Sequence, residues 1–341
     1  MCRALKKLGA KVIGYSLEPP TEPSLYNVLN ISNDIIDVRG DIRDLEHLKA
    51  VFENYKPEIV IHMAAQPIVR ESYKNPVLTY ETNVVGTVNV LECVRLFSCV
   101  RSFVNVTTDK VYLNRELGQP FTEDDRLCGY DPYSNSKSCS ELVTYSYKNS
   151  FFGGVKGVDC NGRKISVSTC RAGNVIGGGD FASDRIVPDC YRACVAKKDI
   201  IVRNPYSIRP YQHVIEPVMC YLYIAMLQYD DSGYADNYNI GPKEDCFITT
   251  GELTDKFCKI WNNDTNDDFS AKWVNVSDNG PHEASFLKLD CTKVLKKTGW
   301  ENKLSIDETM NDTVLFYRYF YQEKDVSALV DRQIENYMKL L

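Results

Sequence analysis

The residues Glu58-Ile59-Val60-Ile61-His62-Met63-Ala64 form a short apolar run that ends in small side chains. Over residues 79–97, apolar side chains recur at helical spacing, and Ser102-Phe103-Val104-Asn105-Val106-Thr107 is the next apolar run. A short apolar run, a helix and a second apolar run are typical of a βαβ unit, in which two parallel strands are buried on both faces. This stretch therefore predicts a parallel sheet with helices on its faces.

The same alternation continues on both sides of this unit. Upstream, strands are predicted at 11–16 and 35–38 with a helix from Leu45 to about Tyr55, and Gly9 is placed to end a helix before the first strand. Downstream, a helix is predicted over 133–150 and a strand over 165–169. The pattern predicts an α/β fold with a doubly wound, Rossmann-like parallel sheet.

After Ala172 the regular pattern ends. Gly177-Gly178-Gly179-Asp180 reads as a loop, and prolines at 188, 205, 210 and 217 interrupt short segments. We therefore expect a first domain over 1–172 and a smaller, mainly substrate-binding domain over 173–341, with part of 211–241 returning to the first domain. Open α/β sheets bind ligands at the carboxyl ends of their strands, so the second domain should lie there.

Composition excludes several classes of protein. The chain is 44% hydrophobic and 25% charged, with a net charge of −6 and a pI near 5.4. This balance argues against a nucleic-acid or anionic-membrane partner, because both need clustered Lys and Arg. The longest apolar run, 218–227, is too short to span a membrane, and the start has no signal-peptide core. A cytoplasmic protein is expected.

Thirteen cysteines are scattered without a Cys-x-x-Cys pair. Cys190 and Cys194 are one helical turn apart but have no nearby partners with zinc spacing. Reduced thiols are expected, with no metal and no disulfide.

The sharpest group of polar residues is Tyr133-Ser134-Asn135-Ser136-Lys137 at the start of the helix over 133–150. A Tyr and a Lys four positions apart share one helix face, and a nearby ammonium group favours the phenolate, so the tyrosine could act as a base near neutral pH. Such pairs also arise by chance on surface helices, so the context decides.

That context consists of polar residues that follow other predicted strands. Thr107 ends the strand at 102–107, and Thr108, Asp109 and Lys110 follow it, although three adjacent polar side chains at a strand end could merely cap a loop. Gly40-Asp41-Ile42-Arg43-Asp44 and His62-Met63-Ala64-Ala65-Gln66 follow two more strands, and Asn83 lies in the helix between. These residues should meet at one edge of the sheet.

Together they resemble the extended short-chain dehydrogenase/reductase family over nearly the whole chain. The resemblance implies that Tyr133 and Lys137 are catalytic and that Thr108 hydrogen-bonds the 4-hydroxyl of a sugar. It also implies NAD as cofactor. The residues that it assigns to NAD are Asp41, Ile42, Ala64, Ala65, Gln66, Asn83, Thr107, Tyr133 and Lys137.

Longer segments are similar to one subfamily, the CDP-glucose 4,6-dehydratases. They are Gly14-Tyr15-Ser16-Leu17-Glu18-Pro19-Pro20-Thr21-Glu22-Pro23-Ser24-Leu25, Asp109-Lys110-Val111-Tyr112, Gly129-Tyr130-Asp131-Pro132-Tyr133-Ser134-Asn135-Ser136-Lys137, Arg171-Ala172-Gly173-Asn174-Val175-Ile176-Gly177-Gly178-Gly179-Asp180, Arg209-Pro210-Tyr211-Gln212-His213-Val214 and Pro281-His282-Glu283-Ala284. The resemblance implies a CDP-linked hexose as substrate, and a homo-oligomer is expected.

The implied reaction oxidises C4, eliminates water across C5 and C6, and returns hydride to C6. Elimination needs an acid and a base besides Tyr133, and the resemblance assigns Asp109 as the acid and Lys110 as the base. Epimerases of this fold usually have small residues at these two positions, so the pair favours a dehydratase. A lysine base requires a pKa far below its reference value of about 10.4, and burial or a neighbouring cation such as Lys137 would have to lower it.

Further residues are candidates for binding. Arg185 and Arg209 could bind the diphosphate, because guanidinium groups match phosphate geometry. Asn174 and His213 could hold sugar or phosphate oxygens, although each of the four could equally be a loop residue. The cofactor-binding region after the strand at 11–16 reads Tyr15-Ser16-Leu17 with Glu18 later, and no arginine there would meet a 2′-phosphate, which favours NAD.

The chain opens inside what should be the first helix of a dinucleotide fold. The strand and the Gly-x-x-Gly-x-x-Gly turn that normally precede this helix are expected to be missing, and about two dozen upstream residues would complete them. The strands around Val12 and Ile59 should then each lack a neighbour. The alternative interpretations are another nucleotide-sugar enzyme, such as an epimerase or decarboxylase, and a non-catalytic relic.

Overall fold

The computed structural model describes residues 1–116, 118–153, 163–263, 269–276 and 287–341. Its central feature is a parallel four-stranded sheet in the order β10-β5-β4-β3. The strands are β3 (Ile59–His62), β4 (Ser102–Thr108), β5 (Ser166–Ala172) and β10 (Asn237–Ile240). The buried pattern of β4 and β5 explains their central places, because helices cover both faces. The predicted doubly wound α/β fold is confirmed.

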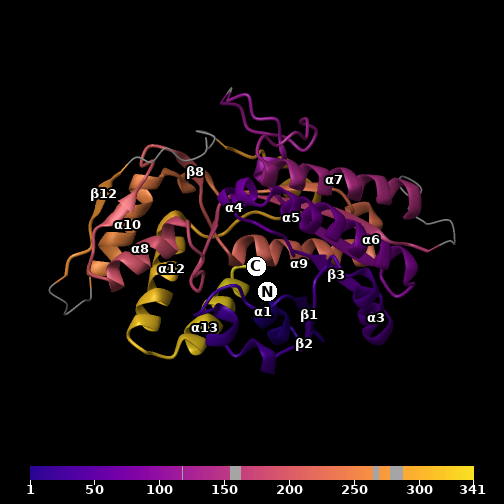
Figure 1. Ribbon diagram of the computed structural model, residues 1–341, viewed down its shortest axis with the longest axis horizontal. Helices are drawn as coiled ribbons and strands as arrows, with labels where there is room; N and C mark the ends of the chain where they lie inside the picture. The colour runs from indigo at the N-terminus through magenta and orange to yellow at the C-terminus, as the bar shows by residue number, and fades with distance from the viewer. Residues whose placement is uncertain (117, 154–162, 264–268, 277–286) are drawn as a thin grey trace.

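A second parallel pair is separate from this sheet. β1 (Ile13–Ser16) pairs with β2 (Ile36–Arg39), and the two lie below β3 in Figure 1. Among the strands that the structure describes, β1 bonds only to β2 and β3 bonds only to β4. The sequence predicted that these two strands would each lack a neighbour, and the interruption of the sheet agrees with that prediction.

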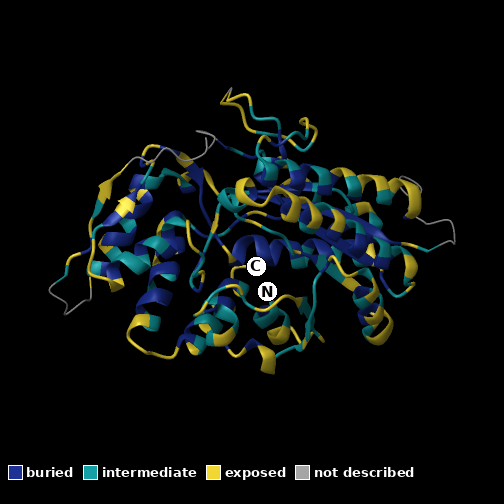
Figure 2. Ribbon diagram, viewed as in Figure 1, coloured by how far each residue is buried: buried dark blue, intermediate teal, exposed yellow. Residues whose placement is uncertain are grey.

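Helices cover the two faces of the larger sheet (Figure 1). On one face, α3 (Leu45–Tyr55), α6 (Gly86–Leu96) and α7 (Pro132–Phe151) share a core with β4 and β5. On the other face, α9 (Ile215–Asp230) packs across the strands with α1 (Cys2–Lys7) and α13 (Val326–Met338). Figure 2 shows α9 as a buried helix at the centre of the molecule.

The helix predicted over 79–97 is divided. The chain forms α5 (Pro76–Tyr80), a π-helical turn η2 (Glu81–Val85) and then α6. Proline at the first position of α5 needs no backbone donor there, which explains the early start. The π turn contains Asn83, whose buried side chain bonds to the segment after β3. The predicted helical segment is therefore confirmed, with a π-helical turn within it that was not predicted.

Part of the second half lies on the left of Figure 1, including α8 (Ile186–Val195), α10 (Thr250–Asn262), α12 (Ile306–Tyr321) and β12 (Trp273–Asn275). Arg185 precedes α8, and Thr249 and Ser305 begin α10 and α12 with capping boxes. The remaining elements are α2 (Leu25–Val28), α4 (Val69–Lys74), α11 (Thr292–Thr298), β6 (Val175–Ile176), β7 (Ile200–Val202), β8 (Ile208–Pro210), β9 (Gln212–His213), β11 (Phe247–Thr249), η1 (Ile31–Asn33), η3 (Asp109–Val111), η5 (Ser232–Tyr234) and η6 (Glu244–Cys246).

Segments from the second half return to the first. α9 and β10 come from the stretch 211–241, and β10 adds to the sheet beside β5. α13 lies against α1, where Arg3 Nε donates to Asp331 at 2.9 Å and Lys7 Nζ to Glu335 at 2.7 Å. The chain termini consequently lie side by side near the centre of Figure 1. Burial lowers the pKa of the Met1 amino group.

Two sequence-level expectations concern thiols and membranes. The twelve cysteines that the structure describes are all free thiols, and seven of them are buried. None of the described helices is long and apolar enough to cross a membrane. The segment around Pro281-His282-Glu283-Ala284, which carries part of the family resemblance, lies outside the described residues.

Candidate active site

The end of β4 brings the predicted acid and base together. Thr108 Oγ1 donates to Asp109 Oδ1 at 3.0 Å, and Lys110 Nζ lies 3.4 Å from the same oxygen. Asp109 is only 1% exposed, and its other oxygen, Oδ2, has no hydrogen-bond partner among the described residues. Thr108 Oγ1 also accepts a hydrogen bond from Lys110 N and so caps η3, as the alternative interpretation of these residues as a loop cap predicts. A buried carboxylate oxygen without a partner is rare, and it is free for a ligand.

Tyr133 is fixed at the first turn of α7. Asp131 caps this helix by accepting from Ser134 N at 3.0 Å, and Pro132 occupies its first position. Gly129 permits the tight approach of the preceding loop, because a Cβ there would lie 2.4 Å from the backbone of Ser134. Tyr133 N donates to Ser72 Oγ at 3.2 Å. These contacts hold the tyrosine beside Thr108, which interacts with its phenol.

The electrostatics of Tyr133 differ from the sequence-based expectation. Burial raises the pKa of Tyr133 to about 12, and the contact with Thr108 offsets only part of this effect. The principal charges that act on the phenol are Asp109, Arg185 and Asp131. Lys137 is not among the principal charges that act on the phenol, so the role of Tyr133 as a base stays a prediction.

Lys137 lies one turn further along α7 and is 5% exposed. Its Nζ donates to Val106 O in β4 at 3.0 Å. Burial lowers the pKa of Lys137 to about 8, while the Glu141 carboxylate acts in the opposite direction. Lys137 shares a helix face with Tyr133, but its ammonium group binds a main-chain carbonyl of β4. It is therefore not one of the principal charges that act on the Tyr133 phenol.

Lys110 also departs from expectation. Its side chain is 32% exposed and its charged neighbour is the Asp109 carboxylate. The Lys137 ammonium is bound at Val106. Among the described residues, therefore, Lys110 has neither the deep burial nor the neighbouring cation expected for a lysine base, and its role stays a prediction.

The predicted cofactor residues lie after β2 and β3. The Asp41 carboxylate accepts from Arg43 Nη2 at 2.7 Å, and its backbone oxygen accepts from Tyr15 Oη at 2.9 Å. Ile42 is buried, and its backbone oxygen accepts from Asn89 Nδ2 at 3.0 Å. After β3, Ala64, Ala65 and Gln66 are half-buried.

Two of these residues bind each other and the active-site helix. Asn83 Oδ1 accepts from Gln66 N at 2.8 Å, and Asn83 Nδ2 donates to Ser136 Oγ at 2.9 Å. Thr107 Oγ1 donates to Glu141 Oε1 at 2.5 Å, also on α7. The predicted cofactor residues after β3 and β4 are therefore anchored to the helix that carries Tyr133 and Lys137.

The sequence has no arginine next to Ser16, but the fold brings one there from a second strand. Arg39, at the end of β2, donates to Ser16 Oγ at 3.2 Å and to Leu17 O at 2.8 Å. Parallel pairing of β1 with β2 brings it there, which spacing along the chain could not reveal. Its guanidinium also lies 2.9 Å from Asp37 and 3.6 Å from Glu18, so acidic neighbours oppose its charge.

The site fits part of a dinucleotide. Lys137 Nζ makes one hydrogen bond among the described residues, although an ammonium has three protons to donate, so two remain for hydroxyl groups of a ribose. Tyr133 lies on the same face one turn away. No Gly-x-x-Gly-x-x-Gly sequence occurs in the 341 residues. Tyr133 and Lys137 would thus hold the nicotinamide end and Asp41 and Ile42 the adenine end.

The four predicted substrate residues come from segments around the start of the second half. A Cβ atom added to Gly173 would lie 3.3 Å from Asp109 Oδ2, so Asn174, the next residue, follows a segment that contacts the predicted acid. Asn174 Oδ1 and Arg185 Nε are buried without a partner among the described residues, and Arg185 lowers the pKa of Tyr133. The structure therefore brings Asn174 and Arg185 to the site.

Arg209 and His213 are buried in short strands. Arg209 Nη1 donates to Ile208 O at 3.1 Å. His213 Nδ1 accepts from Ile215 N at 3.3 Å, and burial lowers its pKa to about 4. A neutral histidine with one ring nitrogen engaged can offer only the other nitrogen to a ligand.

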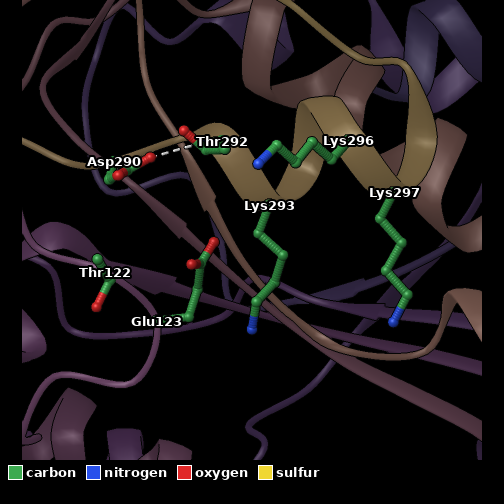
Figure 3. Close-up of a pocket in the computed structure, with 7 residues that line it drawn as sticks. All are labelled: Thr122, Glu123, Asp290, Thr292, Lys293, Lys296 and Lys297. Carbon is green, nitrogen blue, oxygen red and sulfur yellow. Dashed lines mark hydrogen bonds between the residues drawn. The ribbon is translucent and has the colours of Figure 1, made fainter.

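Two features escaped the sequence analysis. The first is a buried ion pair in which Arg171 Nε and Nη2 bind the two oxygens of Glu141 at 2.9 and 3.0 Å. The spacing of Glu141, four residues after Lys137, was the available signal. The second is the open pocket of Figure 3, where Lys293 and Lys297 each form an ion pair with Asp236, which the figure does not label. The pocket is lined by Thr122, Glu123, Asp290, Thr292, Lys293, Lys296 and Lys297.

Comparison with known proteins gives consistent similarities. Residues 4–313 match the family model described as GDP-mannose 4,6 dehydratase. The chain is 41% identical over 336 residues to CDP-glucose 4,6-dehydratase of Salmonella typhimurium. The aligned region covers 98% of this chain and 91% of the relative. It is 24% identical over 299 residues to dTDP-glucose 4,6-dehydratase of Haemophilus influenzae, covering 82% and 81%.

Solved structures show the same fold at low identity. UDP-glucose 4-epimerase of Thermotoga maritima with UDP-glucose aligns with a TM-score of 0.76 and 22% identity, over 93% of this chain and 94% of that one. dTDP-glucose 4,6-dehydratase of Bacillus anthracis in complex with NAD aligns with a TM-score of 0.70 and 20% identity, over 92% and 90%.

Proposed function

Because the chain belongs to the GDP-mannose 4,6-dehydratase family, we propose that it converts CDP-glucose to CDP-4-keto-6-deoxyglucose with NAD as cofactor. The observation that carries this proposal is the 41% identity to a CDP-glucose 4,6-dehydratase over 98% of the chain. The cluster of Thr108, Asp109, Lys110 and Tyr133 supports it, because dehydration needs an acid and a base in addition to the tyrosine.

The side chains divide the proton transfers among them. Tyr133 removes the proton of the 4-hydroxyl, which Thr108 orients. The neutral Lys110 amine, which bound substrate would shield from water, takes the proton from C5 and returns it there when hydride reaches C6. Asp109 enters the cycle protonated and gives its proton to the departing 6-hydroxyl. The proton that Tyr133 takes from the 4-hydroxyl replaces it through Thr108, which interacts with both groups. NAD, when bound, supplies the acceptor for hydride from C4, the donor for its return to C6, and a positively charged ring. Arg185 already lowers the pKa of Tyr133, and further positive charge in the site acts in the same direction.

Three polar atoms that have no partner among the described residues are candidates to hold the substrate. Asp109 Oδ2, Asn174 Oδ1 and Arg185 Nε are buried and unpaired among the described residues. A hexose has hydroxyl groups that both donate and accept, and a guanidinium matches a diphosphate. We propose that Asp109 and Asn174 bind the sugar and that Arg185 binds the diphosphate, with Arg209 and His213 as further contacts.

Product analysis tests the function. Mass spectrometry of CDP-glucose incubated with the protein and NAD should show a product lighter by one water, and NMR should show a methyl group at C6. An epimerase would leave the mass unchanged, and a non-catalytic relic would give no product but could still bind nucleotide in calorimetry. Lys110→Met is the matched control, because it should lose the elimination while it still oxidises C4.

The assembly state is a separate proposal. Val77, Leu78 and Tyr80 of α5 and Leu142 and Tyr145 of α7 are exposed, and α5 and α7 are in contact. None of the exposed side chains of the 20-residue helix α7 is charged. An uncharged, partly aromatic face is typical of an interface, and a twofold pairing brings the same face of two subunits together. We propose that a second copy of the chain covers it.

A further inference from the structure

Glu141 occupies a position that links three elements of the site. On α7 it follows Tyr133 and Lys137 at intervals of four residues, so the three side chains share one face. Its Oε1 accepts from Thr107 Oγ1 at 2.5 Å and from Arg171 Nε at 2.9 Å. Thr107 directly precedes Thr108 in β4, and Arg171 lies in β5.

Arg171 extends this network away from the site. It is 1% exposed, and its Nη1 donates to Tyr112 Oη at 2.7 Å and to Glu123 O at 3.1 Å. Tyr112 Oη in turn donates to Asn239 Oδ1 in β10 at 2.6 Å. The guanidinium therefore ties α7 to β5, to the segment after η3 and to β10.

The burial of the Glu141–Arg171 ion pair has to be explained, because it is not needed for stability alone. Removing charges from water is costly, and an apolar pair of similar size often stabilises a protein at least as well. The proposed reaction itself does not use Glu141 or Arg171. Both charges nevertheless lie directly behind the strand end and the helix face that carry the reacting groups.

Resting on the proposed function, we propose that Glu141 and Arg171 are positioning residues. Their ion pair holds the Tyr133–Lys137 face of α7 at a fixed height against Thr108 and Asp109 at the end of β4. The Glu141 carboxylate also keeps Lys137 in its ammonium form. Burial lowers the pKa of Lys137, and the Glu141 carboxylate acts against this effect.

The groups around Lys137 come from each neighbouring element. The Val106 carbonyl of β4 binds Lys137, while His62 of β3 and Glu141 on its own helix interact with its charge. Thr107 of β4 and Arg171 of β5 both bind Glu141. The pKa of His62 is held near 3 by burial and by Lys137, so His62 remains neutral across the working range. Glu141 is therefore the carboxylate that acts on the Lys137 ammonium.

The first test is Glu141→Gln, which keeps the shape of the side chain and removes its charge. We expect kcat for CDP-glucose to fall roughly 10- to 100-fold with KM within about twofold, since misplacement of reacting groups acts on the chemical step. The alkaline limb of the kcat–pH profile should also move to lower pH. Glu216→Gln is the matched control, because Glu216 is another buried carboxylate, bound by Lys303 N and Leu304 N. It should leave the pH profile in place.

A second pair of variants keeps the ion pair intact. Thr107→Val removes the hydroxyl that binds Glu141, whereas Thr107→Ser retains it. We expect Thr107→Val to lower kcat without moving the alkaline limb, and Thr107→Ser to restore most of the rate. A role limited to overall stability would give equal losses for the two variants, which would overturn the proposal.

A measurement without turnover separates this inference from the proposed function. The titration of Lys137 can be followed by NMR of ε-¹³C lysine, with its signal assigned from Lys137→Arg. We expect its pKa to be lower in Glu141→Gln than in the wild type and unchanged in Glu216→Gln. An unchanged titration in Glu141→Gln overturns the inference, whereas a wild type that forms no dehydrated product overturns the proposed function.

Discussion

At the scale of single residues, Tyr133 combines two opposing requirements. Its burial raises its pKa to about 12, yet the proposed reaction needs its phenolate. Tyr133→Phe should therefore lower the rate of CDP-glucose turnover by about 10²–10⁴, because it deletes the atom that carries the proton. Calorimetric affinity for CDP-glucose should change little. A variant that retains more than about a tenth of the wild-type rate would contradict the role of Tyr133.

Two buried histidines give the protein a specific response to acid. Burial lowers the pKa of His62 to about 3 and that of His213 to about 4, below the unfolded value near 6.5. Below pH 6.5 the unfolded chain binds protons at these histidines, whereas the folded chain keeps them neutral. The free energy of unfolding is therefore unaffected by them above pH 6.5 and decreases as the pH falls toward 4. Each histidine contributes at most about 1.4 kcal/mol per pH unit.

Urea unfolding between neutral pH and pH 4 measures this effect. We expect His62→Gln to give a shallower loss of stability with falling pH than the wild type. His47→Gln is the control, since this histidine on α3 is only half-buried. Parallel curves for His62→Gln and the wild type would show that His62 is not held neutral by the fold.

Much of the site could be predicted from the residues, but the partners of each charge could not. The order of strand ends and the Tyr133–Lys137 spacing indicated which residues meet. Helical spacing fixes the face of α7 and says nothing about the Val106 carbonyl that binds Lys137. The contact of Arg39 with Ser16 depends on the pairing of β1 with β2, which is a property of the folded sheet.

At the scale of elements, α7 presents an unusual polar face to the core. Ser140 Oγ lies 3.0 Å from Thr87 Oγ1 and accepts from Asn105 Nδ2 at 3.0 Å. Ser140→Ala leaves these buried groups with fewer partners, and we expect it to cost about 1–3 kcal/mol of unfolding free energy. Ser146→Ala, on the exposed side of the same helix, should change it by less than about 0.5 kcal/mol. Chemical denaturation of both variants makes the comparison, and equal effects would exclude a structural role for the Ser140 hydroxyl.

Element boundaries show the same division between what sequence does and does not reveal. The strands at β1 to β5 and the helices α3 and α7 were predicted to within a few residues, because apolar periodicity is strong there. The π turn at η2 was not, since the periodicity of residues 79–97 suits one helix. Its extra residue depends on Asn83 reaching Gln66 and Ser136, which are distant in sequence.

At the scale of the whole molecule, the uncharged face of α7 allows a direct test of assembly. Tyr145→Arg places a charge on the proposed twofold interface. There the new arginine of one subunit would face the same arginine, or an apolar side chain, of the other subunit. We expect the mass measured by light scattering to fall from that of the wild-type oligomer toward that of one chain. Tyr206→Arg, at an exposed tyrosine of the other half, should leave the mass unchanged. A wild type that is already monomeric would refute the interface.

The separation of β1 and β2 from the larger sheet also sets how the protein melts. No ladder of main-chain hydrogen bonds joins the two sheets among the described strands, so only side chains and connecting segments couple them. Heat should therefore release the β1–β2 layer before the four-stranded core. The calorimetric enthalpy of unfolding should then exceed the van't Hoff enthalpy taken from the sharpness of the main transition, as it does in a chain with more than one cooperative unit.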